Sequence, residues 1–137
     1  MIKEKGFSKQ ERICNRNDFK LLFSDGKSFF SYPFRCIFHW TASNESLVRI
    51  AISVSKKKFK LATDRNRIKR LIREAYRLEK QYLYNRIQKH PITLDLLIIY
   101  TENKILDYEQ LQNKIRILMK KTIDELLEQF TGNHPFD

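Results

Sequence analysis

The chain has 137 residues, of which 42% are hydrophobic and 12% aromatic, with only 3 Gly and 3 Pro. This composition excludes a disordered tail or a low-complexity linker and predicts one folded domain, residues 1–137, with loose ends at about 1–7 and 131–137. The formal net charge of +11 points to a polyanionic partner, either nucleic acid or an anionic membrane surface.

The cysteine usage indicates a reducing compartment. Cys14 and Cys36 are too few for a disulfide scaffold and lack the spacing of a zinc site. No segment reaches the ~18 apolar residues of a membrane span, and the first residues lack the apolar core of a signal peptide. We therefore expect a cytoplasmic protein with no metal site of its own.

The first predicted elements are a helix and two strand segments. Capping residues precede an apolar run over 16–25, and Gly26 follows it, which predicts a short helix. The segments "KSFFSYPFRCIFHW" and "LVRIAISVS" are typical of strands, and "TASNES" between them is a turn. In the second segment apolar residues alternate with small or polar ones, which predicts one apolar and one polar face. The apolar set is Val48, Ile50, Ile52 and Val54.

After a basic helix, "PITLDLLIIY" is a nearly continuous apolar run, as expected of an interior strand. A last helix is predicted over roughly 106–130, with apolar residues at helical spacing. These are Leu111, Ile115, Leu118, Met119, Ile123, Leu126 and Leu127. The two strand segments before the basic helix provide two or three strands, and the order, written αβββαβα, predicts an α+β fold, a two-layer sandwich of a roughly four-stranded mixed sheet with three helices.

The positive charge is concentrated in one segment. Residues 56–80 carry eleven Lys and Arg against three acids, whereas the other 112 residues carry 16 basic and 13 acidic groups. Such a concentration is expected of a localised binding face and not of a surface that is merely soluble.

The basic helix, "DRNRIKRLIREAYR", divides into two arcs at ~100° per residue. One arc is apolar and should pack on the sheet: Ile68, Leu71, Ile72, Ala75, Tyr76 and Leu78. The other is a cationic ridge: Asn66, Lys69, Arg70, Arg73, Arg77 and Lys80. Charged helix faces are often only solvated, but here the acids that would pair the cations are nearly absent, and cations in the first turn oppose the helix dipole. Phosphate backbone is the expected ligand.

No protein active site is expected. His39, His90 and His134 are scattered, and neither a metal-ligand spacing nor a glycine-rich phosphate loop is present. Asp64 and Glu74 are better explained as a helix cap and as an i,i+4 partner of Arg70 or Arg77.

The segment "SVSKKKFKLATDRNRIKRLIREAYR" resembles the signature of the bacterial ribonuclease P protein component, and "NRNDFKLLFSDGKSF" resembles that family's first helix and following turn. The resemblance extends over most of the chain. It implies that the motif helix and the preceding loop bind the catalytic RNA and that the first helix contacts the single-stranded 5′ leader of precursor tRNA. The residues that match the family's motif helix are Arg65, Asn66, Arg67, Lys69, Arg70 and Arg73, and those that match its leader-binding helix are Phe19, Lys20 and Phe23. The charge pattern adds Lys56, Lys57, Lys58, Lys60 and Arg77 to the expected RNA-binding residues.

The resemblance also implies which roles belong to the RNA and which to the protein. The RNA holds Mg²⁺ and cleaves the 5′ leader from precursor tRNA, while the protein contributes no catalytic residue and needs no protein partner and no membrane. The implied fold is like the second domain of ribosomal protein S5, with an uncommon left-handed βαβ crossover. Lys60 stands where the family commonly has a glycine.

Three other functions remain open from the residues alone. A non-catalytic RNA-binding or ribosomal-type protein would explain the charge equally well. A DNA-binding module is disfavoured by the shortage of neutral base-reading side chains on the ridge. A membrane-surface helix is the least expected, because the apolar arc is needed for the core.

Overall fold

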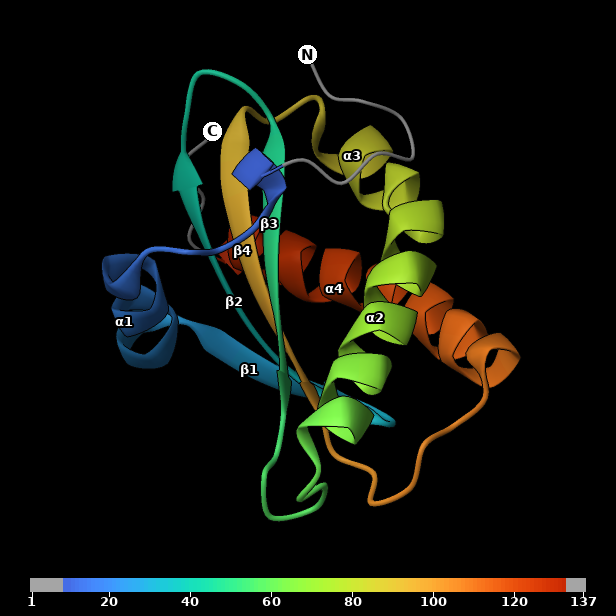
Figure 1. Cartoon of the computed structure of the whole chain (residues 1–137). Coiled ribbons are helices and arrows are strands. Elements are labelled where there is room, and N and C mark those ends of the chain that lie inside the picture. The colour runs from blue at the N-terminus through green and yellow to red at the C-terminus, as the bar shows by residue number, and fades with distance from the viewer. Residues whose placement is uncertain (1–8, 133–137) are drawn as a thin grey trace.

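Four α-helices, one short 3₁₀ helix and four strands form within residues 9–132, the part of the chain that this computed structural model describes (Figure 1). In chain order they are η1 Lys9–Glu11, α1 Arg16–Asp25, β1 Lys27–Ser31, β2 Phe34–Ala42, β3 Leu47–Val54, α2 Ala62–Glu79, α3 Gln81–Ile87, β4 Ile92–Tyr100 and α4 Tyr108–Gly132. The ends expected to be loose lie almost wholly outside the described residues, except that α4 continues through Gly132.

The strands form one mixed sheet in the order β1-β2-β4-β3. β2 pairs antiparallel with both β1 and β4, whereas β3 pairs parallel with β4. Both faces of β4 are covered, since Leu96 is fully buried and its neighbour Leu97, which faces the other way, is only 4% exposed. This confirms the interior strand that the apolar run predicts.

The prediction of three helices is wrong, because α3 is a further helix between α2 and β4. Lys80 joins α2 to α3 with φ −63° and ψ −24°, so the backbone stays in the right-handed helical region between them. Leu83, Tyr84 and Ile87 bury one side of α3 in the main core. The observed order is therefore αβββααβα.

Helices lie on both faces of the sheet (Figure 1). On one face Ile72 of α2 and Ile115 of α4 belong to the main core together with Leu96 of β4. On the opposite face Leu22 of α1 packs with Leu97 in a second, smaller cluster. The expected two-layer sandwich is therefore incomplete, because α1 forms a partial third layer that covers only part of its face.

Gly26 lets α1 lead directly into β1. Its φ of −74° is accessible to any residue, so the requirement for glycine is one of space. A Cβ here would collide with the carbonyl oxygen of Leu22 and would lie 2.7 Å from Cγ2 of Ile37. The missing side chain is what allows α1 to lie so close to β2.

The N-terminal segment lies along the free edge of β3. The Ile13 amide donates a hydrogen bond to the Ile50 carbonyl at 3.0 Å, and Arg12 forms a parallel bridge with Ile50. This segment separates the two pockets described below.

Lys80 does not lie on the exposed ridge, as its position on the helical arc predicts, but is fully buried. Its ammonium lies 2.9 and 2.8 Å from the two carboxylate oxygens of Glu11, which is 2% exposed. The Tyr84 hydroxyl also donates to Glu11, at 2.9 Å. A buried charge needs such partners because burial removes its hydration. Lys80 therefore anchors the N-terminal segment to the junction of α2 and α3.

Candidate nucleic-acid interface

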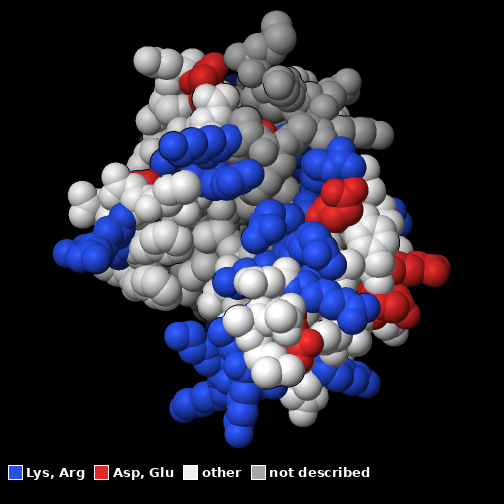
Figure 2. All heavy atoms as spheres, in the orientation of Figure 1, with Lys and Arg blue, Asp and Glu red and all other residues white. Residues whose placement is uncertain are grey.

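Helix α2 has the two faces that its sequence predicts. Its apolar side contributes four buried residues: Ile68, Ile72, Ala75 and Tyr76. Leu71 and Leu78 are half-buried at the border of this side. On the outer side Lys and Arg side chains gather over α2 and over the loop that precedes it (Figure 2).

The exposed ridge differs from the arc that the periodicity predicts, because Lys69 and Arg77 are half-buried and Lys80 is buried, whereas Arg67, which the arc leaves out, is exposed. From here on we use the name ridge for the centre of the outer face, which consists of Asn66, Arg67, Arg70 and Arg73. All four side chains are exposed. Within residues 9–132, none of the three arginines has a hydrogen-bonding or ion-pair partner. Their guanidinium groups repel one another at i,i+3 spacing and keep all their donors available. This arrangement suits the forked recognition of phosphate oxygens.

Arg65 is partly used inside the protein. Its Nη1 donates to the carbonyls of Phe59 and Lys60 at 2.7 and 3.0 Å, which ties the preceding loop to the first turn of α2. Helix α2 begins after Leu61, with no side-chain cap. The prediction that Asp64 is the cap is therefore wrong, since Asp64 lies within the first turn.

Arg77 is also engaged, with Glu74. Its Nε and Nη2 lie 3.0 and 2.6 Å from the two carboxylate oxygens. This hydrogen bonding lowers the pKa of Glu74. The prediction that Glu74 pairs with Arg70 or Arg77 is confirmed for Arg77, although the spacing is i,i+3 and not i,i+4. Arg77 is thus less available to a ligand than the ridge arginines.

The loop before α2 carries Lys56, Lys57, Lys58 and Lys60, which we call the basic loop. All four are exposed. The Lys58 ammonium contacts the carbonyl of Thr101 at the end of β4. The basic loop therefore continues the positive surface of α2 toward the end of the sheet (Figure 2).

A pocket of about 280 Å³ brings the first helix and the motif helix together. Phe19 of α1 lines it from one side, and Lys69 and Arg73 of α2 line it from the other. The remaining lining residues are Arg12, Ile13, Cys14, Ile50, Ala51 and Ile52. An apolar floor with cations at its rim suits an unpaired nucleotide, which has a flat base and an anionic phosphate.

The three residues expected on α1 differ in exposure. Phe19 is half-buried and packs on the small cluster around Leu22. Lys20 is exposed, and Phe23 is 66% exposed. Only Phe19 therefore has the anchoring role that the i,i+4 spacing of two phenylalanines would suggest.

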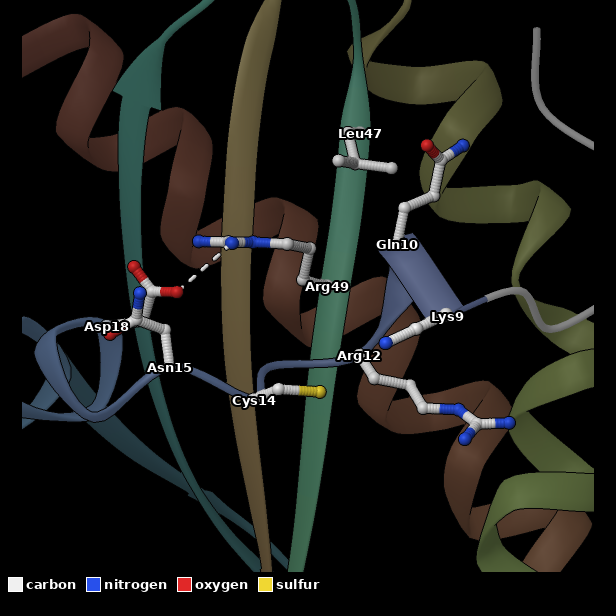
Figure 3. A pocket seen from close by; sticks show the side chains of 8 residues that line it. All are labelled: Lys9, Gln10, Arg12, Cys14, Asn15, Asp18, Leu47 and Arg49. Carbon is white, nitrogen blue, oxygen red and sulfur yellow. Dashed lines mark ion pairs between the residues drawn. The ribbon is translucent and has the colours of Figure 1, made fainter.

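A second pocket, of about 690 Å³, lies on the other side of the N-terminal segment (Figure 3). Its lining residues are Lys9, Gln10, Arg12, Cys14, Asn15, Asp18, Leu47 and Arg49. Figure 3 shows Arg12 pointing away from α1, toward the side on which α2 lies. Arg12 lines both pockets, so it lies at the boundary between them.

Arg49 joins α1 to the sheet. It donates to both carboxylate oxygens of Asp95 at 2.7 Å and lies 3.1 Å from Asp18 of α1 (Figure 3). Burial raises the pKa of Asp95, and the opposing attraction of Arg49 does not fully cancel this effect. The ion pairs of Arg49 with Asp18 and Asp95 thus hold the start of α1 against the sheet, although they require the Asp95 carboxylate to be buried.

Replacing Arg49 by alanine is expected to destabilise the fold in a pH-dependent way. Without Arg49, the pKa of Asp95 in the folded state rises further above 3.8, its ordinary value. The folded state then binds a proton more tightly than the unfolded state, so stability falls as the pH rises above that value. Melting temperatures from pH 4 to pH 7 should show a widening gap between Arg49→Ala and the unmodified chain. Arg35→Ala, an exposed change on β2, is the control, and a gap that is constant with pH would contradict this account.

Sequence reasoning missed Arg12 and Arg49. Arg12 stands in a segment too short for a periodic signal, and it approaches Lys69 and Arg73 only through the pairing of Ile13 with Ile50. Arg49 belongs to the polar face predicted for β3, but its partners Asp18 and Asp95 are distant in sequence. An arginine in an otherwise small-residue strand face was the one available signal.

The described residues contain no group of three or more His, Cys, Asp or Glu side chains that could hold a metal ion. No helix among them has the length and hydropathy needed to cross a membrane.

Comparison with known proteins identifies the family. The family described as Ribonuclease P matches residues 7–123. A ribonuclease P protein component from Porphyromonas gingivalis is 32% identical over 131 residues, covering 95% of this chain and 90% of that protein. One from Thermotoga maritima is 30% identical over 120 residues, covering 84% and 94%.

Comparison with solved structures identifies the same family. The RNase P protein from Thermotoga maritima superposes with a TM-score of 0.64 at 29% identity, covering 81% of this chain and 96% of that one. The Staphylococcus aureus RNase P protein gives 0.63 at 28% identity, covering 83% and 96%. The chain therefore belongs to the ribonuclease P protein family, as the protein component of a ribonucleoprotein endoribonuclease that processes the 5′ end of precursor tRNA.

Proposed function

We propose that the ridge and the basic loop dock this chain on the catalytic RNA of ribonuclease P. The observation that carries the proposal is the set of three exposed arginines on α2 with no partner among the described residues. A helix gains nothing from such a row of repelling charges unless an external polyanion neutralises it. Lys69 and the four lysines of the basic loop extend the same surface. Arg65 and Arg77 are less available to the RNA, because they already bind groups of the protein itself.

We further propose that the 5′ leader of precursor tRNA lies across α1 and the pocket of about 280 Å³. Phe19 forms part of the pocket, Lys20 faces a phosphate, and the exposed ring of Phe23 stacks on a base. Lys69 and Arg73 line this pocket as well, so leader and catalytic RNA approach one another along α2. The protein contributes no catalytic residue in this arrangement.

Magnesium ions are held mainly by the RNA in this proposal. Among the described residues no group of three or more His, Cys, Asp or Glu side chains could hold a metal ion, so the proposal assigns no magnesium site to this chain. RNA phosphates provide the anionic oxygens that phosphodiester hydrolysis requires. The chain works with two partners, the catalytic RNA and the precursor tRNA, and requires neither a further protein nor a membrane. Its cytoplasmic location stays a prediction.

The experiment that tests this function is cleavage of a 5′-extended precursor tRNA at low magnesium by the cognate ribonuclease P RNA, with and without the chain. Stimulation that requires both components is expected. Tight, salt-sensitive binding without stimulation would contradict the subunit role and would favour the alternative, a non-catalytic RNA-binding or ribosomal-type protein.

Replacing Phe23 by alanine is expected to weaken binding of leader-bearing precursor more than binding of mature tRNA. Stacking of one base on an aromatic ring contributes roughly 1–3 kcal/mol, so precursor affinity should fall about fivefold or more. The melting temperature should change little because Phe23 is 66% exposed. Leu21→Ala is the matched control, since Leu21 is an exposed apolar residue on the same helix, at 41%. Equal losses for precursor and mature tRNA would exclude a contact with the leader.

A further inference from the structure

The turn between β1 and β2 lies against the end of β4 and the basic loop. The backbone amide and the hydroxyl of Thr101 both donate to the Pro33 carbonyl, at 2.9 and 2.8 Å. The carbonyl of Thr101 accepts from the Lys58 ammonium. The turn that carries Tyr32 is therefore continuous with the positive surface that includes the basic loop.

Tyr32 is exposed in this turn but held in place. Its side chain is 47% exposed, and its hydroxyl donates to the carboxylate of Glu102. The ammonium of Lys114, from α4, lies 5.6 Å from the centre of the ring. Contacts with Glu102 and Lys114 thus hold the ring of a residue that is about half exposed to solvent.

One cation, Lys114, lies over this ring, and two others, Lys58 and Lys104, act on the carboxylate that holds it. Hydrogen bonds from Tyr32 and from the Asn103 amide lower the pKa of Glu102, and the charges of Lys104 and Lys58 lower it further. Lys58, Lys104 and Lys114 therefore outnumber the single carboxylate that orients Tyr32. We call Tyr32 with these three lysines the turn site.

We propose that the turn site binds an unpaired nucleotide of the catalytic RNA, with the base stacked on Tyr32 and the phosphate facing the lysines. This inference rests on the proposed function. A single exposed aromatic residue needs no explanation by itself. A ring that is held by a carboxylate, with one lysine over it and two more near that carboxylate, is different, because single-stranded nucleic acids bind aromatic platforms with cations nearby.

The catalytic RNA is a better occupant than the leader. Lys58 makes the turn site continuous with the basic loop, which docks the catalytic RNA in the proposed function. Helix α1, which receives the leader, packs through Leu22 on the opposite face of the sheet from α4, which provides Lys114. Figure 1 shows β1 leading away from α1 toward the end of the molecule at which α2 begins.

The test is the affinity of the full chain for the cognate ribonuclease P RNA, measured without precursor tRNA. Tyr32→Ala is expected to weaken binding at least about fivefold, whereas Tyr32→Phe, which keeps the ring, should stay within about twofold. Phe30→Ala is the matched control, because Phe30, at the end of β1, is 45% exposed and its ring makes no cation–π contact with a lysine of the described residues. Equal losses for Phe30→Ala and Tyr32→Ala would overturn the inference.

Two further variants separate the possible outcomes. Arg70→Ala on the ridge reports on the proposed function, so a loss for Arg70→Ala with none for Tyr32→Ala overturns only the turn site, and no loss for either overturns both. A Tyr32→Ala effect that appears only with precursor tRNA present would assign the surface to the leader and would also overturn the inference.

If Tyr32→Ala lowers the melting temperature, the double variant Lys104→Ala with Lys114→Ala tests the inference instead. This pair should reduce the salt slope of RNA binding by about 1 to 2, and an unchanged slope would overturn the inference.

Discussion

Replacing Arg67 and Arg70 together by alanine is expected to weaken binding of the catalytic RNA about a hundredfold, with little change in melting temperature. Each guanidinium can make charge-assisted hydrogen bonds to phosphate, and losing one such contact typically lowers affinity tenfold or more. Both side chains are exposed and have no partner among the described residues, so their removal leaves no buried group unsatisfied. The slope of log affinity against log salt concentration should decrease by about 2, since two phosphate contacts are lost.

The matched control removes two arginines from another surface. The double variant Arg86→Ala with Arg116→Ala lowers the net charge by the same amount. Arg86 lies over the ring of Tyr82 on α3, and Arg116 of α4 pairs with Glu79 at the C-terminal end of α2. If both double variants lost equal affinity, net charge and not the ridge would explain RNA binding. A parallel fall in melting temperature and affinity for the ridge variant would show instead that the ridge supports the fold.

Most of the ridge could be predicted from the sequence because a helix repeats its faces every few residues, and the periodicity alone separates Ile68 and Ile72 from Arg70 and Arg73. Arg67, which the predicted arc leaves out, follows from the family motif. The same rule misplaces Lys80. Its angular position puts it with the cations, but its partner Glu11 stands 69 residues earlier in the chain. A buried ion pair leaves no local pattern, so only the folded arrangement shows it.

The order of elements could be predicted for a similar reason, with one exception. The sequence predicts a helix that begins at a capping residue, as α1 does, and a strand in which apolar and polar residues alternate, as in β3. Helix α3 was missed because no cap separates it from α2. The left-handed crossover from β3 to β4 stays a prediction that rests on the family resemblance.

The proposed leader site shows the same limit. Phe19, Lys20 and Phe23 follow from the family motif, but the walls of the neighbouring pockets come from Arg12 and Arg49. These two arginines reach their positions through the pairing of a short segment with β3 and through carboxylates on α1 and β4. Such long-range contacts determine the shape of the site, whereas the motif determines its chemistry.

Breaking the buried pair of Lys80 and Glu11 is expected to be the most destabilising single change in the chain. Removing one partner leaves the other charge buried, which costs about 3–5 kcal/mol, out of a total stability of about 5–15 kcal/mol. Lys80→Met should therefore lower the melting temperature by on the order of 10 °C. Arg116→Ala is the control, since it breaks an ion pair whose arginine is 59% exposed and should have little effect.

The double variant Glu11→Leu with Lys80→Met tests whether the charges of these two side chains or only their packing stabilises the fold. With both charges removed, the penalty of a lone buried charge disappears, so the double variant should be more stable than Lys80→Met alone. Because Glu11 anchors the segment that Arg12 and Ile13 attach to β3, Lys80→Met should also weaken leader binding at temperatures where it remains folded. If the double variant were less stable than both single variants, packing of the two side chains and not their charges would hold the segment in place. The wall of the leader pocket would then depend on the shape of this buried cluster.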